Sequence, residues 1–192
     1  MAYFLPSPRL YNFFFLLLFF CCCFFTLLIN PTSSHPTQPT SELVESVCNT
    51  TTIYEFCVDA LYSNPRTPTI HDPYSLAYIS FTLAIVNATD ARLNMQILLK
   101  SNSSRSLYSK PLRRCVQLYG EAAETLGRAL NDMNSDDYYD LAPYAADCTR
   151  KADNCQAAFG GRATDSRLSR MNRDFRGLAE ICIVVSNICY PG

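Results

Sequence analysis

Histidine is scarce in this sequence, and glycine-rich stretches are absent. His35 and His71 are the two histidines among 192 residues, too few for a histidine-based catalytic triad or a paired-histidine metal site with good context. Gly160-Gly161 is typical of a helix end rather than of a phosphate-binding loop. We therefore expect no catalytic residue, no metal site and no cofactor, and the protein is not expected to be an enzyme.

Neither sign of charge is in excess. The chain carries 16 Lys and Arg against 17 Asp and Glu, a formal net charge of -1. A nearly neutral chain lacks the positive field that attracts phosphate backbones, so we expect no nucleic-acid partner.

The first 34 residues have the pattern of a secretory signal peptide. Arg9 is the only charged residue before Glu42, and a run that is apolar apart from Thr26 extends from Phe13 to Ile29. A retained membrane anchor is the alternative, but the run is at the lower limit for a span and no basic cluster follows it. We expect cleavage near Ser34, a polar leader over 35–40, secretion, and no membrane association after cleavage.

Cysteine is plentiful, with ten in the chain. Cys21, Cys22 and Cys23 lie in the signal segment, and the odd number that remains predicts at least one unpaired thiol in an oxidising compartment. Three sequons make Asn49, Asn87 and Asn102 candidates for N-glycosylation.

After residue 40 the apolar residues follow helical spacing, and no alternating β pattern competes with it. We predict a short helical hairpin over 41–71 and four long helices over 73–101, 107–133, 136–159 and 164–189. Pro143 lies inside the third of these, so its regular part is alternatively expected to start or kink around 141–143. The predicted core stripe of the first long helix is Leu76, Ile79, Leu83, Val86, Leu93 and Ile97. That of the third is Tyr138, Leu141, Ala145, Cys148, Ala152, Cys155 and Phe159. The fold class is all-α, an antiparallel up-down-up-down four-helix bundle preceded by the hairpin, within one domain over 41–189.

The register of antiparallel helices indicates which cysteines meet. Cys48 and Cys57 flank a break in the hairpin, and a bridge between them would close it. Facing residues of the second and third long helices should have numbers that sum to about 269, and Cys115 with Cys155 sums to 270. For the third and fourth long helices, the same reasoning gives facing residues whose numbers sum to about 324. In that register Cys148 and Cys182 would lie roughly 9 Å apart along the helix axis, too far for a disulfide. Cys148, Cys182 and Cys189 are therefore expected to be free.

Two clusters of polar residues have ordinary structural explanations. Asp132, Asp136, Asp137 and Asp140 suit the start of a helix better than calcium binding, because EF-hand spacing is absent. The arginines at 167, 170, 173 and 176 suit a solvated helix face. One helix start contains three tyrosines, Tyr138, Tyr139 and Tyr144. Tyrosine is common at core positions where its hydroxyl reaches solvent and also at protein interfaces.

Several short motifs resemble the plant pectin methylesterase and invertase inhibitor family over residues 41–189. They are E-F-C-V-D-A-L before Asn64-Pro65, D-P-Y-S-L-A-Y-I from Asp72, Cys115 in the second long helix, and Asp137-Tyr138 followed by A-A-D and C-Q-A-A-F. Within the family, the chain looks most similar to the group that contains plane-tree pollen allergens. The resemblance implies a secreted inhibitor of the cell wall or vacuole that occludes a plant carbohydrate-active enzyme, with bridges Cys48–Cys57 and Cys115–Cys155.

The resemblance also bears on the target. Invertase-blocking members carry a Pro-Lys-Phe motif near the start of the third long helix, where this chain has Asp136-Asp137-Tyr138-Tyr139. The acidic cleft of a glycosidase would repel the carboxylates of Asp136 and Asp137. This favours pectin methylesterase over invertase as partner. We expect target contacts at Asp136, Asp137, Tyr138, Tyr139 and Tyr144. A bundle that carries a small apolar ligand, or has only an allergen-like packing role, is the alternative.

Overall fold

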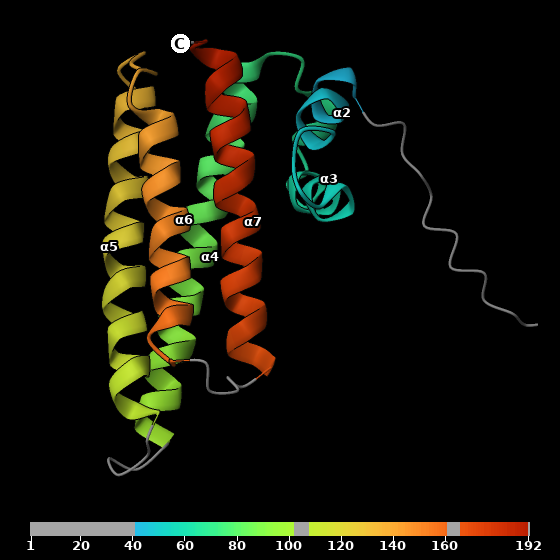
Figure 1. Cartoon of the computed structure of the whole chain (residues 1–192). Coiled ribbons are helices and arrows are strands. Elements are labelled where there is room, and N and C mark those ends of the chain that lie inside the picture. The colour runs from blue at the N-terminus through green and yellow to red at the C-terminus, as the bar shows by residue number, and fades with distance from the viewer. Residues whose placement is uncertain (1–40, 102–107, 161–165, 192) are drawn as a thin grey trace, which may run out of the picture. The chain divides into compact units, whose positions relative to one another are not determined.

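The computed structural model describes residues 41–101, 108–160 and 166–191, all within one compact unit of the chain (Figure 1). The expected signal peptide over 1–34, the leader over 35–40 and the sequon at Asn102 lie outside the described residues. Over the described ranges every regular element is a helix, and no strand is present.

The described chain begins with the helical hairpin, made of α2 (Glu42–Cys48), α3 (Tyr54–Tyr62) and the 3-10 turn η1 (Thr67–Thr69). Ser41 caps α2, since its hydroxyl accepts from the amide of Val44, and its own amide donates to the hydroxyl of Tyr62 at 2.8 Å. Because the Thr50–Ile53 segment breaks the helix, α3 folds back beside α2.

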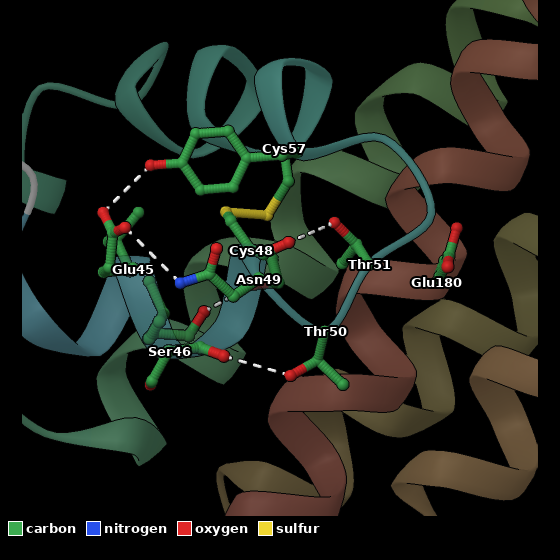
Figure 2. The surroundings of a disulfide bond; sticks show 12 residues. Glu45, Ser46, Cys48, Asn49, Thr50, Thr51, Cys57 and Glu180 are labelled. Carbon is green, nitrogen blue, oxygen red and sulfur yellow. Dashed lines mark hydrogen bonds between the residues drawn. A yellow bond between two sulfur atoms is a disulfide. The ribbon is translucent and has the colours of Figure 1, made fainter.

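A disulfide joins Cys48 to Cys57 and closes the hairpin (Figure 2). Around it, Glu45 accepts from the side chain of Asn49 and from the hydroxyl of Tyr54, and Thr51 donates to the carbonyl of Cys48. So short a segment buries little apolar surface of its own, and a bridge across a loop of this size contributes about 2.7 kcal/mol in the chain-entropy model.

Both helices of the hairpin pack against the last helix, α7 (Ser166–Cys189). Glu180 accepts from the amide and the hydroxyl of Thr52, at 2.7 and 2.6 Å. The ring of Phe56 lies over Gly177 so closely that a Cβ at that position would be 2.5 Å from the ring. The absence of a side chain at Gly177 thus lets α3 approach α7.

The bundle consists of α4 (Pro73–Ser101), α5 (Ser109–Met133), α6 (Leu141–Ala157) and α7. Each helix contacts the next, and α4 also contacts α7, so the four surround one core. Neighbours run antiparallel: Arg92 and Ile85 of α4 lie beside Gly120 and Gly127 of α5, respectively. The second disulfide joins Cys115 of α5 to Cys155 of α6. Both bridges are the pairs that the sequence indicates.

The core stripe predicted for the first long helix is confirmed at Leu76 and Ile79, which are buried, and is wrong from Val86 onward. Val86, Leu93 and Ile97 are 54%, 52% and 61% exposed. Besides Leu76 and Ile79, the helix buries a face of mostly small residues: Ala77, Ser80, Phe81, Ala84, Ala88, Ala91 and Met95. Small side chains let α4 approach its neighbours closely, and this packing outweighs the larger apolar content of the opposite face.

The third long helix, α6, begins at Leu141, so the predicted bound at residue 136 is wrong and the alternative start around 141–143 is confirmed. Asp136 has a φ of 56°, a left-handed conformation that ends helical geometry. Pro143 supplies the second reason. It would clash within a helix that started at 136, but in α6 it occupies the first turn, where its missing N–H has no partner to lose.

The register of α6 against α7 differs from the expected one. Asn172 donates to Gln156, and Arg176 pairs with Asp153 at 3.4 Å. The numbers of residues that face each other across α6 and α7 therefore sum to about 328 rather than 324. The connection between the helices is longer than expected, because α6 ends at Ala157 and α7 starts at Ser166. Cys148 and Cys182 are thus almost level instead of roughly 9 Å apart along the helix axis. In the structure both are free and buried, as is Cys189.

Candidate functional site

The turn between α5 and α6 holds two carboxylates in an exposed position. The amide of Asp136 donates to the carbonyl of Met133 at 3.1 Å, and the amide of Asp137 donates to that of Asp132 at 2.9 Å. The side chain of Asp137 then accepts from the amide of Tyr139 at 3.1 Å. These bonds fix the backbone over 133–139 while the side chains of Asp136 and Asp137 remain exposed.

Two pairs of tyrosine rings meet beside this turn. Tyr138 contacts Tyr74 of the first turn of α4 with ring centroids 4.7 Å apart, and Tyr139 contacts Tyr190, just beyond α7, at 5.5 Å. Both pairs are edge-on, a favourable geometry for aromatic rings. The start of α4, the α5–α6 turn and the end of α7 therefore form one surface.

A pocket of about 440 Å³ lies within this surface. We call its lining the tyrosine end of the bundle: Tyr74, Asp136, Asp137, Tyr138, Tyr139, Cys189 and Tyr190. Tyr139 is 66% exposed and Tyr190 50%. Tyrosine is enriched at protein interfaces because it contributes a large rigid ring together with a hydroxyl.

The electrostatics of the tyrosine end are acidic. Residues 130–141 contain four aspartates and no lysine or arginine. Partial burial, then the charge of Asp136, raises the pKa of the Tyr138 hydroxyl. Burial, together with the charge of Asp72, raises the pKa of the Cys189 thiol to about 11, so this thiol is protonated at neutral pH. The surface thus offers aromatic rings and carboxylates, a combination suited to a cationic partner.

Four of the five contact residues expected from sequence come together here, and the fifth lies apart. Tyr144 is on the first turn of α6 and faces α5, where Arg128 lies over its ring at 5.7 Å. Burial and a hydrogen bond to Asp132 raise the pKa of its hydroxyl. The Tyr144 ring therefore helps to join α5 and α6 beside the tyrosine end.

Sequence reasoning missed Tyr74, Tyr190 and Cys189. A usable signal was available, because an antiparallel bundle places the start of its first helix and the end of its last helix beside the second turn. Tyr74 follows the cap at Asp72, and Tyr190 directly follows α7.

A polar cluster joins the outer faces of α5 and α6. Asp147 pairs with Lys151 and, at 3.1 Å, with Arg150. Thr125 of α5 accepts from Arg128 at 3.1 Å and lies 3.4 Å from Asp147. Burial lowers the pKa of Lys151. Each of its charged side chains has a hydrogen-bond partner within the cluster, as expected of a structural network.

Within the described ranges, no group of three or more His, Cys, Asp or Glu side chains is placed to hold a metal ion. Of the described sequons, Asn49 is exposed at the end of α2. Asn87 lies in the middle of α4 with its side-chain oxygen buried and without a hydrogen-bond partner among the described residues. Asn49 is therefore the better placed of these two candidates for a glycan.

The chain matches the plant invertase/pectin methylesterase inhibitor family over residues 42–185, most of its length. It belongs to that family. Family members are inhibitors of plant pectin methylesterase or invertase and are not themselves enzymes.

Individual relatives divide between the two targets. An Arabidopsis thaliana protein named cell wall / vacuolar inhibitor of fructosidase 2 is 33% identical, over 78% of this chain and 82% of its own length. The pectinesterase inhibitor of Actinidia deliciosa is 27% identical, over 86% and 89%. A crystal structure of a mutant pectin methylesterase inhibitor from Arabidopsis superposes with a TM-score of 0.67 at 22% identity, over 77% of this chain and 97% of the other, which shows the shared fold.

No helix among the described residues of this family member is long and apolar enough to cross a membrane.

Proposed function

We propose that this protein is a secreted inhibitor of pectin methylesterase in the plant cell wall or vacuole, and that its tyrosine end covers the substrate cleft of the enzyme. The observation that carries the proposal is the pocket in which Tyr74, Tyr138, Tyr139 and Tyr190 surround the carboxylates of Asp136 and Asp137. Inhibition of this kind requires occlusion only and no covalent chemistry.

The charge of the tyrosine end favours an esterase over a glycosidase. Pectin is a partly esterified uronate polymer, and a cleft that holds such a polyanion benefits from positive charge, which complements two exposed aspartates. An invertase cleaves a neutral sugar with a pair of carboxylates, and an acidic cleft would repel Asp136 and Asp137. The turn also lacks the Pro-Lys-Phe sequence of invertase-blocking members.

Invertase is the second candidate, favoured by the 33% identity to a fructosidase inhibitor. Nothing in the described structure favours a carrier of small apolar ligands. The bundle core is filled by large side chains such as Tyr119, Phe81 and Phe175, and the tyrosine-end pocket lies at the surface.

Titration of both enzymes with the mature protein tests the proposal. Pectin methylesterase activity should fall to zero near one equivalent, while invertase activity should be unaffected at the same concentration. Inhibition of invertase alone would transfer the function to the second candidate, and inhibition of neither enzyme would overturn the proposal.

A further inference from the structure

The charges of the bundle are segregated along its axis. Residues 91–120 contain no aspartate or glutamate, whereas residues 130–141 contain four aspartates and no lysine or arginine. Helix α5 connects the two regions, and from Arg113 to Met133 it rises about 30 Å. That distance exceeds three Debye lengths at physiological ionic strength, roughly 8 Å each, so the two ends act independently on charged partners.

The basic end lies opposite the tyrosine end. We define it by six exposed side chains on three helices: Lys100 of α4, Lys110, Arg113 and Arg114 of α5, and Arg167 and Arg170 of α7. The helices are neighbours here, since Arg92 of α4 lies against Gly120 of α5 and Arg167 donates to Asn94 of α4 at 2.6 Å.

Four of the other basic residues of the bundle have acidic partners. Arg150 and Lys151 pair with Asp147, Arg173 pairs with Asp174, and Arg176 pairs with Asp153. Within the described ranges, Lys100, Lys110, Arg113 and Arg114 form no ion pair. On α5, Lys110, Arg113 and Arg114 share the solvated face, because Pro111 and Leu112 between them and Cys115 after them are buried.

From this arrangement we infer that the basic end binds an acidic polysaccharide of the polyuronate class. Its side chains spread over three helices, which suits a polymer that carries a carboxylate on each sugar better than a small anion. Arginine binds carboxylates through paired N–H groups, and the basic end contains four arginines. The identity of the polymer rests on the proposed function, because pectin methylesterase releases carboxylates on this class of chain.

The inference gives the two ends of the molecule different roles. The basic end would hold the inhibitor on de-esterified polymer, while the tyrosine end, about 30 Å away along α5, stays available for an enzyme working on the same polymer. Local concentration at the substrate would then raise the effective affinity without any new contact to the enzyme.

Retention of the mature protein on immobilised polygalacturonate tests the inference. Fully methyl-esterified pectin and vesicles of anionic phospholipid serve as competing surfaces. We expect retention on polygalacturonate that decreases with added salt, and none on the esterified polymer, since both polymers share a backbone and differ in charge. Equal binding to the two polymers, or binding to the vesicles alone, would overturn the inference.

Two triple variants locate the binding. Lys110→Gln/Arg113→Gln/Arg114→Gln should weaken polygalacturonate binding about tenfold, as expected for three exposed ion pairs of modest individual strength. The matched control, Arg150→Gln/Arg173→Gln/Arg176→Gln, removes exposed arginines that already have acidic partners and should bind as the native protein does. Unchanged binding by the first variant would contradict the inference.

Both variants should retain the native helical circular dichroism and should inhibit the target enzyme in solution as the native protein does, because the tyrosine end is untouched. Enzyme inhibition is thus measured separately from polymer binding, and failure of one proposal is distinguishable from failure of the other.

Discussion

The ring of Phe56 in α3 packs directly over Gly177 in α7, since a Cβ on residue 177 would lie 2.5 Å from that ring. Gly177→Ala should therefore displace α3 and lower the free energy of unfolding by about 1–3 kcal/mol, the usual cost of overpacking. Urea denaturation monitored by circular dichroism measures the effect.

Gly127→Ala is the matched control, because its nearest neighbour is the tip of Ile85 at 3.9 Å and α5 would gain helix propensity. That variant should be unchanged or stabilised by up to about 1 kcal/mol. Equal effects of the two substitutions would show that the hairpin does not depend on the gap at Gly177.

The hydroxyl of Tyr119 donates to Asn172 across the core at 2.7 Å, and Asn172 in turn donates to Gln156. Tyr119→Phe leaves the Asn172 carbonyl buried without this donor, so we expect a loss of about 1–3 kcal/mol in urea denaturation. Tyr78→Phe, which alters a tyrosine that is 43% exposed, should change stability by less than about 0.5 kcal/mol. A loss for Tyr119→Phe no larger than that of this control would contradict the assigned role of the bond.

The buried thiol of Cys148 predicts sensitivity to alkali. Burial raises its pKa from 9.0 to about 12, so the folded protein holds this proton more tightly than the unfolded chain. The associated stability is complete below pH 9 and is lost as pH rises through the folded pKa. Between pH 8 and 10.5 the loss attributable to Cys148 is about 2 kcal/mol.

Cys148→Ala should be less stable than the native protein at pH 8, because a small cavity replaces the sulfur, but it should lose less stability on going to pH 10.5. Urea denaturation at both pH values measures the difference. Parallel losses in the two proteins would rule out this thiol as the titrating group.

A charge change in the α5–α6 turn tests target preference. Asp137→Lys should weaken inhibition of pectin methylesterase and improve inhibition of invertase. The lysine in the turn would be repelled by a positively charged esterase cleft and attracted by the acidic cleft of invertase. Asp137→Asn is the control, since it keeps an oxygen for the Tyr139 amide but removes the charge. The asparagine variant should lie between the native and lysine forms, and the reverse order would contradict the electrostatic argument.

The sequence predicted α5 well and α4 poorly, for one physical reason. In α5 only one face is apolar, so Cys115, Ala122 and Leu126 could be assigned to the core without ambiguity. In α4 both faces are apolar, and the large residues Leu93 and Ile97 suggested the wrong one. Which face is buried depends on how closely α5 and α7 can approach, and that is a property of the assembled bundle.

The candidate site shows a similar limit. Tyr138 and Tyr139 adjoin Asp136 and Asp137 in sequence, so local composition was enough to find them. Tyr74 and Tyr190 lie at the start of the first bundle helix and just beyond the end of the last, and they meet the others only because α4 begins where α7 ends. Helix boundaries mattered as well, since the left-handed Asp136 turns the acidic segment into an exposed loop.

The most direct test of the central claim is the inhibition constant of Tyr139→Ala/Tyr190→Ala toward pectin methylesterase, with Ile97→Ala as an equally exposed apolar control away from the tyrosine end. Tyrosines at the centre of an interface contribute about 2 kcal/mol or more when truncated, so the double variant should inhibit at least about 100-fold more weakly. Ile97→Ala should remain within about twofold, less than 0.5 kcal/mol. Undiminished inhibition by the double variant, with its helical circular dichroism intact, would show that the enzyme binds elsewhere on the bundle.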